Sequence, residues 1–356
     1  MLICEALEEG IITEYKTLGI VGKDIIQQCD LSIISAKDIN DLNHINLMGF
    51  NIISAVIEKK EDIDEIKEIL SEEARKNLRV FAKIDTKTGI LNFDSILENA
   101  DGIIIQNFVG SMKINYSELR SVMMYIIEKC KIKSKPIILK LNSLKSMNVN
   151  RPITSKISSI EFCVKEGIDS ILIYEESLDF NENEYLNTLR AFRQMLLQVE
   201  AYCDNISKFE EISKLFAINI DQVSMQEYNL NCLMECAARL SHEIKADLII
   251  LFTDNKRYVK VLSQFSPNCI VAVPSSIGNE ASFLRLLRGV IPYYHSSDLV
   301  EYSSIESSLG KIVTSFKSKK LIKEDLVKII IVNAFSNNSN YKYKNSIFVI
   351  NPDSKF

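Results

Sequence analysis

The sequence lacks any apolar run long enough to span a bilayer, which argues against a membrane-embedded chain. Its start, MLICEALEEG, has no basic segment and carries acidic residues early, so we expect no secretory signal. Basic residues are not in excess either, because 47 acidic and 42 basic side chains give a net charge of −5. Nucleic-acid binding normally requires a basic face. We therefore expect a cytoplasmic protein that binds neither membrane nor nucleic acid.

The eight cysteines include no CxxC pair, which argues against a zinc site of the usual spacing. Cys232 and Cys236 lie four residues apart in an apolar stretch with helical periodicity, and His242 alone would not complete a metal site. Free cysteines behave as small hydrophobic residues in reducing compartments. We expect these cysteines to pack in the core.

The first part of the chain alternates short β-branched runs with amphipathic helical stretches. Continuous apolar strands separated by helices are typical of a parallel sheet covered by helices. A (β/α) barrel of the TIM type needs eight such units, and this pattern supplies five. The fold class expected is α/β, beginning with an incomplete TIM-type barrel. Strands are predicted at residues 51–57, 79–84, 102–106, 136–141 and 170–174, and helices at 61–70, 93–99, 116–130, 159–166 and 184–202.

The second part predicts an open α/β sheet, separated from the first by a polar segment at residues 202–221. With 356 residues, the chain is long enough for two domains of ordinary size. Strands are predicted at residues 247–253, 269–274, 290–294, 328–332 and 346–350, and helices at 228–242, 256–265, 281–287 and 304–316.

Short motifs along almost the whole chain follow the order of one family. Residues 81–85 read FAKID, residues 100–103 read ADGI, and residues 136–138 read PII. Residues 247–274 run from DLIILFT to CIVAVP. These segments resemble the SKIEN, SDGI, PVI and IIVLT…APIIAVT motifs of the pyruvate kinase family. Each motif alone is weak, but their collinearity predicts that fold.

The resemblance also implies a division of the chain. Residues 4–10, CEALEEG, look like the last strand of the family's small lid barrel, and barrel strands one to three have no counterpart. We expect a lid or linker remnant at residues 1–34, a partial (β/α) barrel at 35–205, and an α/β C-terminal domain at 206–356. Alternatively, the sequence is a fragment of a longer product.

Pyruvate kinases transfer a phosphoryl group between phosphoenolpyruvate and ADP with Mg²⁺, K⁺ and a lysine. Lys83 matches the position of that lysine, and Asp85 replaces a metal-binding glutamate with a carboxylate one methylene shorter. Glu176 matches the glutamate of an SGE motif, and Gly110 falls in the segment that binds phosphoenolpyruvate. The resemblance therefore implies Lys83 as a catalytic residue, Asp85 as a metal ligand, and weaker substrate positions at Glu176 and Gly110.

Three other positions depart from the family's pattern. Phe108 replaces a glycine whose amides contact the substrate, and Val109 replaces the second metal carboxylate. Leu141 replaces a threonine that helps to protonate the enolate. These changes remove a close backbone approach, a metal ligand and a hydroxyl from one site.

The second part contains the counterpart of an effector loop that binds sugar bisphosphate in many family members. Thr253, Lys256 and Arg257 retain polar or basic side chains there. Asp254 places a negative charge beside them, and the loop's glycine is missing. We expect loss of that effector, because a carboxylate repels phosphate.

The resemblance leaves two functional hypotheses. The first is a divergent pyruvate kinase homologue of glycolysis that is catalytically impaired and acts as a non-catalytic or regulatory subunit. It would assemble with itself or with a full-length pyruvate kinase through the open strand edges near Ile53 and Leu172. The alternative is an active pyruvate kinase that uses Lys83 and Asp85.

Overall fold

The computed structural model describes residues 34–48, 50–106, 116–142, 154–174, 182–218, 225–275, 279–294, 302–323, 327–335 and 345–350. The chain divides into two compact units, residues 1–33 and residues 34–356. The described residues all belong to the second unit, which contains two five-stranded sheets.

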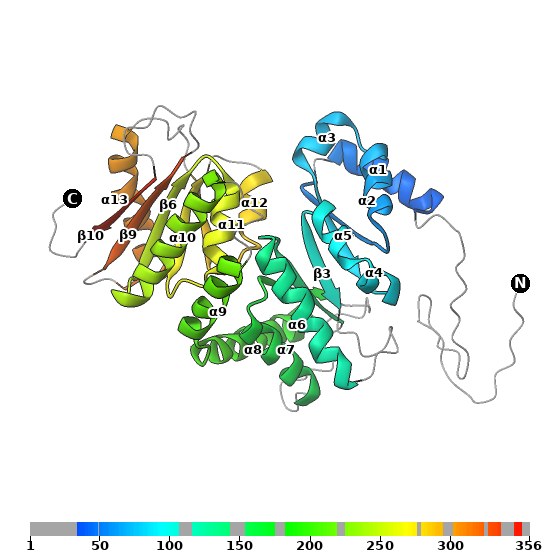
Figure 1. Ribbon diagram of the computed structural model, residues 1–356, viewed down its shortest axis with the longest axis horizontal. Helices are drawn as coiled ribbons and strands as arrows, with labels where there is room; N and C mark the ends of the chain where they lie inside the picture. Colours follow the sequence, from blue (N-terminus) through cyan, green and yellow to red (C-terminus); the bar gives the residue numbers. More distant parts are fainter. Residues whose placement is uncertain are drawn as a thin grey trace, which may run out of the picture. The chain divides into compact units, whose positions relative to one another are not determined.

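The first sheet is parallel throughout, with the strand order β1-β2-β3-β4-β5. Its strands are β1 (Ile52–Val56), β2 (Arg79–Ile84), β3 (Gly102–Gln106), β4 (Ile137–Asn142) and β5 (Ser170–Tyr174). The accompanying helices are α1 (Ala36–Met48), α2 (Lys60–Ile69), α3 (Glu72–Asn77), α4 (Lys87–Leu91), α5 (Phe93–Asn99), α6 (Tyr116–Ile132), α7 (Thr154–Glu166) and α8 (Glu182–Ala201). This arrangement confirms the five predicted strand–helix units of a partial barrel (Figure 1).

Alternate residues of each strand face opposite sides of this sheet. On β2, Val80, Ala82 and Ile84 belong to the large core that the helices cover. Phe81 packs on the opposite face in a separate small cluster, and Lys83 lies on the same face as Phe81. The sheet therefore has one helix-covered face and one face whose carboxyl end carries polar side chains.

The second sheet has the order β10-β9-β6-β7-β8, with only the β10–β9 pair antiparallel. Its helices cover both faces: Ile249 and Leu251 of β6 pack with α10 and α11, whereas Leu248 and Ile250 pack with α13 (Figure 1). The predicted open α/β sheet is confirmed. The strands are β6 (Leu248–Thr253), β7 (Ile270–Ser275), β8 (Val290–Tyr294), β9 (Ile329–Ala334) and β10 (Ser346–Ile350), and the helices are α9 (Asn205–Ile218), α10 (Met225–Glu243), α11 (Lys256–Gln264), α12 (Asn279–Leu284) and α13 (Tyr302–Ser318).

An aspartate just before a strand joins that strand to its neighbour at three places. The carboxylate of Asp101 accepts a hydrogen bond from the amide of Val80 at 3.0 Å, and Asp169 accepts from Ile137 at 2.9 Å. Asp247 accepts from the amide of Lys328 at 3.0 Å. Each carboxylate accepts from an amide at the start of a neighbouring strand. At that position the hydrogen-bond ladder between the strands does not supply a carbonyl acceptor.

The α12 segment, residues 279–288, packs against the first sheet on its helix-free face. Phe283 and Leu286 contact the cluster formed by Phe81, Ile104 and Ile138. Ser170 donates from its hydroxyl to the Leu286 carbonyl at 2.6 Å. These contacts bury the amino-terminal half of that face and leave its carboxyl end to the candidate site.

Two details differ from the sequence-based expectation. The polar segment at residues 202–221 contains α9, and its Phe209 and Ile212 belong to the core of the second sheet. Cys130 and Cys163 are buried as expected, but Cys236 is exposed, so the prediction of core packing is wrong for that residue. Among the described residues, no helix combines the length and the apolarity needed to cross a membrane.

Candidate functional site

Lys83 and Asp85 lie together at the carboxyl end of β2. Lys83 is the fifth residue of the strand, and Asp85 follows the strand's last residue. The Lys83 ammonium forms an ion pair with Oδ2 of Asp85, and the two side chains are 20% and 19% exposed. The predicted catalytic lysine and the predicted metal ligand are thus direct partners.

The turn after Asp85 is held close to the end of β1. The Thr86 hydroxyl accepts from the Gly89 amide at 3.1 Å and caps α4. A Cβ at Gly89 would lie 2.9 Å from the Ile57 carbonyl oxygen, a distance that side-chain carbons do not adopt without a shift. The glycine therefore permits the close approach that fixes the position of Asp85.

The remaining oxygen of Asp85, Oδ1, is buried and has no hydrogen-bond partner among the described residues. Mg²⁺ is commonly held by one or two carboxylates together with substrate phosphates and water. Within the described part of the chain, no group of three or more histidine, cysteine or acidic side chains could hold a metal ion. One carboxylate that is already paired with an ammonium group does not make a Mg²⁺ site, so these residues do not fit the metal.

Leu141 is placed away from this pair. It is 8% exposed and belongs to the helix-side core, where it pairs in register with Ile173 of β5. Lys140 has the opposite orientation on β4, on the face shared by Ile138 and Lys83. The sequence comparison with the family did not single out Lys140, which adds a second basic residue to this face.

Four other predicted positions, Phe108, Val109, Gly110 and Glu176, lie outside the described residues. The structure does not place them relative to Lys83.

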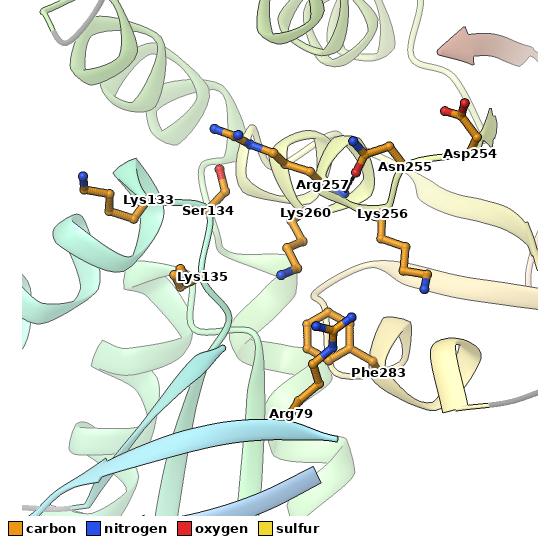
Figure 2. A pocket seen from close by; sticks show the side chains of 10 residues that line it. All are labelled: Arg79, Lys133, Ser134, Lys135, Asp254, Asn255, Lys256, Arg257, Lys260 and Phe283. Atoms are coloured by element: carbon orange, nitrogen blue, oxygen red, sulfur yellow. Dashed lines mark hydrogen bonds between the residues drawn. The ribbon is translucent and has the colours of Figure 1, made fainter. Parts of the chain in front are cut away.

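The predicted effector loop is described in full, and its polar groups are engaged locally. The Thr253 hydroxyl accepts from the Asn255 amide at 3.0 Å and donates to the Asn255 carbonyl at 3.1 Å. Asn255 caps α11 by accepting from the Arg257 amide at 2.9 Å, and the Arg257 guanidinium pairs with Glu227. Lys256 and Arg257 line one cavity, but Thr253 is not part of its lining (Figure 2). The structure thus brings together only two of the three predicted positions.

Besides Lys133, three basic residues that the sequence did not single out line the same cavity. Arg79 is the first residue of β2, Lys135 precedes β4, and Lys260 lies in the second turn of α11. They are separated by about 50 to 180 residues along the chain, so no local motif marks them. The available signal was a basic residue at or just before the beginning of two barrel strands, β2 and β4, because the beginnings of parallel strands lie at one edge of the sheet.

Residues 1–181 match the pyruvate kinase barrel domain, and residues 231–346 match the pyruvate kinase alpha/beta domain. Similar curated proteins include the pyruvate kinase of Lachancea kluyveri, which is 24% identical over 90% of this chain and 62% of its own length. The pyruvate kinase of Hypocrea jecorina is 26% identical over 84% of this chain and 54% of its own length.

Pyruvate kinase 1 of Saccharomyces cerevisiae is 25% identical over 83% of this chain and 57% of its own length. The chain therefore spans between 54% and 62% of the length of these three relatives. The first matched region contains β1 to β5, and the second contains β6 to β9 and the first residue of β10.

Proposed function

Since this chain belongs to the pyruvate kinase family, we propose that it is a divergent glycolytic member that acts as a non-catalytic or regulatory subunit. It assembles with itself or with a full-length, active pyruvate kinase. The observation that carries this proposal is the ion pair between Lys83 and Asp85. In this pair, the lysine expected to act on the phosphoryl group and the carboxylate expected to bind the metal neutralise each other.

Phosphoryl transfer depends on cations that neutralise the charge developing on the transferred group. An ammonium whose nearest partner is a carboxylate contributes less positive potential than an unpaired one. Leu141 does not add to this argument, because it packs in the helix-side core, on the face of the sheet opposite to Lys83. The ion pair supports a chain whose scaffold is retained while its chemistry is weakened.

The strand order supports the assembly part of the proposal. β1 and β5 are the outer strands of the first sheet, and no described strand pairs with the outer edge of either. Leu172 of β5 is 43% exposed on the open face. Unpaired strand edges beside exposed apolar side chains favour pairing with another chain.

We keep the predicted division into residues 1–34, 35–205 and 206–356 as part of this proposal. The packing of α9 on the second sheet supports a division just before that helix. A cytoplasmic location is proposed with it, since a glycolytic partner would be found there.

Assembly is tested by native mass spectrometry of the chain purified from its own cell under mild conditions. The proposal predicts a mass above one chain, either as a homo-oligomer or with a pyruvate kinase bound. A monomeric mass with no pyruvate kinase attached contradicts it. Peptides that precede Met1 in the native protein would also overturn the subunit role, because further strands could then cover the outer edges.

The second candidate function is pyruvate kinase activity itself. It is favoured by one observation, the uncommitted Oδ1 atom of Asp85 beside Lys83 at the carboxyl end of a barrel strand. A coupled assay with phosphoenolpyruvate, ADP, Mg²⁺ and K⁺ tests it against a Lys83→Ala control. Turnover equal in the two proteins would exclude this function.

A further inference from the structure

A second cavity, of about 250 Å³, is lined by residues of α9, of α10 and of the end of α6. The three helices are in contact, because α9 packs against both of the others. An engineered apolar cavity of about 150 Å³ holds benzene, whereas pockets for drug-sized ligands usually measure about 300 to 1,000 Å³. The size of this cavity therefore suits a compact molecule of one or two rings.

The apolar part of the lining consists largely of aromatic rings. Phe216 of α9 and Phe265, the residue after α11, both line the cavity, with ring centres 5.1 Å apart. Phe265 is fully buried, and Ile132 at the end of α6 adds an aliphatic side chain. Aromatic rings attract one another in offset or edge-on arrangements. This lining therefore favours an aromatic ligand.

The polar part of the lining contains one group without a partner. The hydroxyl oxygen of Ser213 on α9 is buried, and no described residue forms a hydrogen bond with it. Buried hydroxyls in native proteins normally have a partner. The pKa of Tyr228 is raised, first by its hydrogen bond with the Cys232 thiol, so these two lining groups already pair with each other. Ser213 thus favours a ligand with a hydrogen-bonding group of its own.

The charged side chains of the lining have partners of opposite charge. Arg257 and Glu227, both in the lining, form an ion pair with each other. Glu235 lies 3.4 Å from the guanidinium of Arg239, and Lys133 lies 3.7 Å from a carboxylate oxygen on α5. Among the described residues, the lining therefore has two acidic and two basic side chains, all paired. A charged ligand would lose its hydration without gaining an unpaired countercharge, so an uncharged one is favoured.

We propose that this cavity binds a small, uncharged aromatic molecule of the phenol type. Its ring lies beside Phe216 and Phe265, and its hydroxyl forms a hydrogen bond with Ser213. A hydroxyl both donates and accepts, so either direction of this bond gives the serine a partner. Both phenylalanines pack in the core of the second sheet, whereas Ile132 belongs to a helix of the first. The ligand would thus contact the helices of both sheets and stabilise them together.

This ligand differs in class from the sugar bisphosphate expected at the loop of residues 253–257. Of that loop, the lining includes only Arg257, whose guanidinium pairs with Glu227. The ligand carries no charge and needs no cation. The inference does not depend on whether the chain is catalytic.

Isothermal titration calorimetry of the full chain with 2-naphthol tests the proposal. Naphthalene-2-carboxylate, which has the same two rings and a negative charge, is titrated in parallel. The proposal predicts saturable binding of 2-naphthol and much weaker binding of the carboxylate, since the lining offers no unpaired cation. Absence of saturable heat with 2-naphthol, or equal affinity for both compounds, overturns it.

Two cysteines of α10 locate the bound molecule. Both are free thiols: Cys232 lines the cavity, whereas Cys236, one helical turn later, is exposed and is not part of the lining. A thiol reacts only where the reagent can reach its sulfur. Saturating 2-naphthol should slow the alkylation of Cys232 by iodoacetamide severalfold and leave Cys236 unchanged, as followed by peptide fragmentation in a mass spectrometer. A rate at Cys232 that 2-naphthol does not change, or equal protection of both cysteines, contradicts the proposal.

Variants of α9 test the hydrogen bond itself. Ser213→Ala should weaken 2-naphthol binding by about two- to tenfold, the range for one net hydrogen bond. Ser207→Ala is the matched control on the same helix, because its hydroxyl donates to Asp204 at 2.6 Å and lies outside the lining, so affinity should not change. Equal affinities of the two variants would show that Ser213 does not bind the ligand.

Thermal unfolding separates a binding role from a structural one. Ser213→Ala removes a buried hydroxyl without a described partner, so its melting temperature without ligand should stay equal or rise. 2-Naphthol should raise the melting temperature of the unchanged chain more than that of Ser213→Ala. A large loss of stability in Ser213→Ala together with unchanged affinity would assign the serine to packing and contradict the proposal.

Discussion

At the scale of single residues, what the candidate site can bind depends on the partners that its polar groups already have. Lys83 and Asp85 were predicted as a catalytic lysine and a metal ligand, and in the structure they pair with each other. Asp85 keeps one oxygen without a partner among the described residues. The chemistry of the site therefore depends on the partners of its residues as much as on their identity.

The sequence predicted Lys83 and Asp85 because they lie in a short motif, but it could not predict their ion pair. Leu141 shows the same limit of the sequence. The sequence shows that a leucine stands there, but not that its side chain points to the helix-covered face of the sheet. Arg79, Lys135 and Lys260 were missed because their proximity arises only from the topology.

Gly102 provides a test of packing at the start of β3. A Cβ at this position would lie 2.2 Å from the fully buried ring of Phe81. Gly102→Ala should lower the free energy of unfolding by about 1–3 kcal/mol, as overpacked cores do. Urea denaturation measures this. Gly310→Ala is a matched control, because nothing lies within 4 Å of its added Cβ and a helical glycine gains about 0.5–1 kcal/mol on that change. Equal effects of the two substitutions would refute the account.

Asp169 gives a pH-dependent prediction. Burial raises the pKa of this carboxyl from 3.8 to about 6, although the amides of Ile137 and Arg288 bond to it. The folded chain thus binds more protons than the unfolded chain between about pH 4 and 6, so ionisation of Asp169 lowers stability as pH rises through this range.

Asp169→Asn removes that ionisation. The unfolding free energy of the variant, relative to the unchanged chain, should increase from pH 4 to 6 and become constant above about pH 7. Urea titrations at each pH measure the difference. Parallel stability curves over the whole range would show that the carboxyl does not titrate as inferred.

At the scale of elements, the aspartates before β3, β5 and β6 explain how neighbouring strands begin in register. Asp247 precedes β6, and its carboxylate accepts from the Lys328 amide next to β9. An aspartate followed by an apolar run is visible in the sequence, but its bond to a strand about 80 residues away is not.

Removing one of these carboxylates should leave the amide that it accepts from without its protein partner. Asp247→Ala is expected to cost about 0.5–1.5 kcal/mol of unfolding free energy, the net contribution of a typical hydrogen bond, whereas Asp247→Asn retains an acceptor oxygen and should cost less. Asp64→Ala, at an exposed position of α2, serves as the control and should change stability by less than about 0.5 kcal/mol. A cost for Asp247→Asn as large as that for Asp247→Ala would contradict the role of the acceptor.

Most elements were predictable because their periodicity is strong. All ten strands were expected within one or two residues of their observed bounds, since their apolar runs are short and end at polar or glycine residues. The helix α9 was missed because its polar residues outnumber the few, Phe209 and Ile212 among them, that reach the core. The short helices α3 and α4 were missed because they are too brief for a periodic signal.

At the scale of the whole molecule, the α12 segment couples the two sheets of the unit formed by residues 34–356. Phe283 packs against Phe81, with ring centres 6.3 Å apart, and Arg288 donates to the Val164 carbonyl at 2.7 Å. Contacts of this kind make two sheets unfold together when their free energy is large enough.

Phe283→Ala tests this coupling. Truncating a buried phenylalanine usually costs about 3–5 kcal/mol, and here the loss falls on the contact between the two sheets. We expect differential scanning calorimetry to show one transition for the unchanged chain and two for the variant. A single transition in both proteins, shifted only in temperature, would mean that other contacts carry the coupling.

The central claim is that this member of the pyruvate kinase family contributes scaffold rather than chemistry. The most direct measurement is steady-state turnover of phosphoenolpyruvate and ADP by the chain alone and by any complex that purifies with it, each prepared with and without Lys83→Ala in this chain. The account predicts that the substitution changes neither rate, because the paired Lys83 does not take part in catalysis. A large fall in either rate would show that this chain supplies a catalytic lysine and would contradict the account.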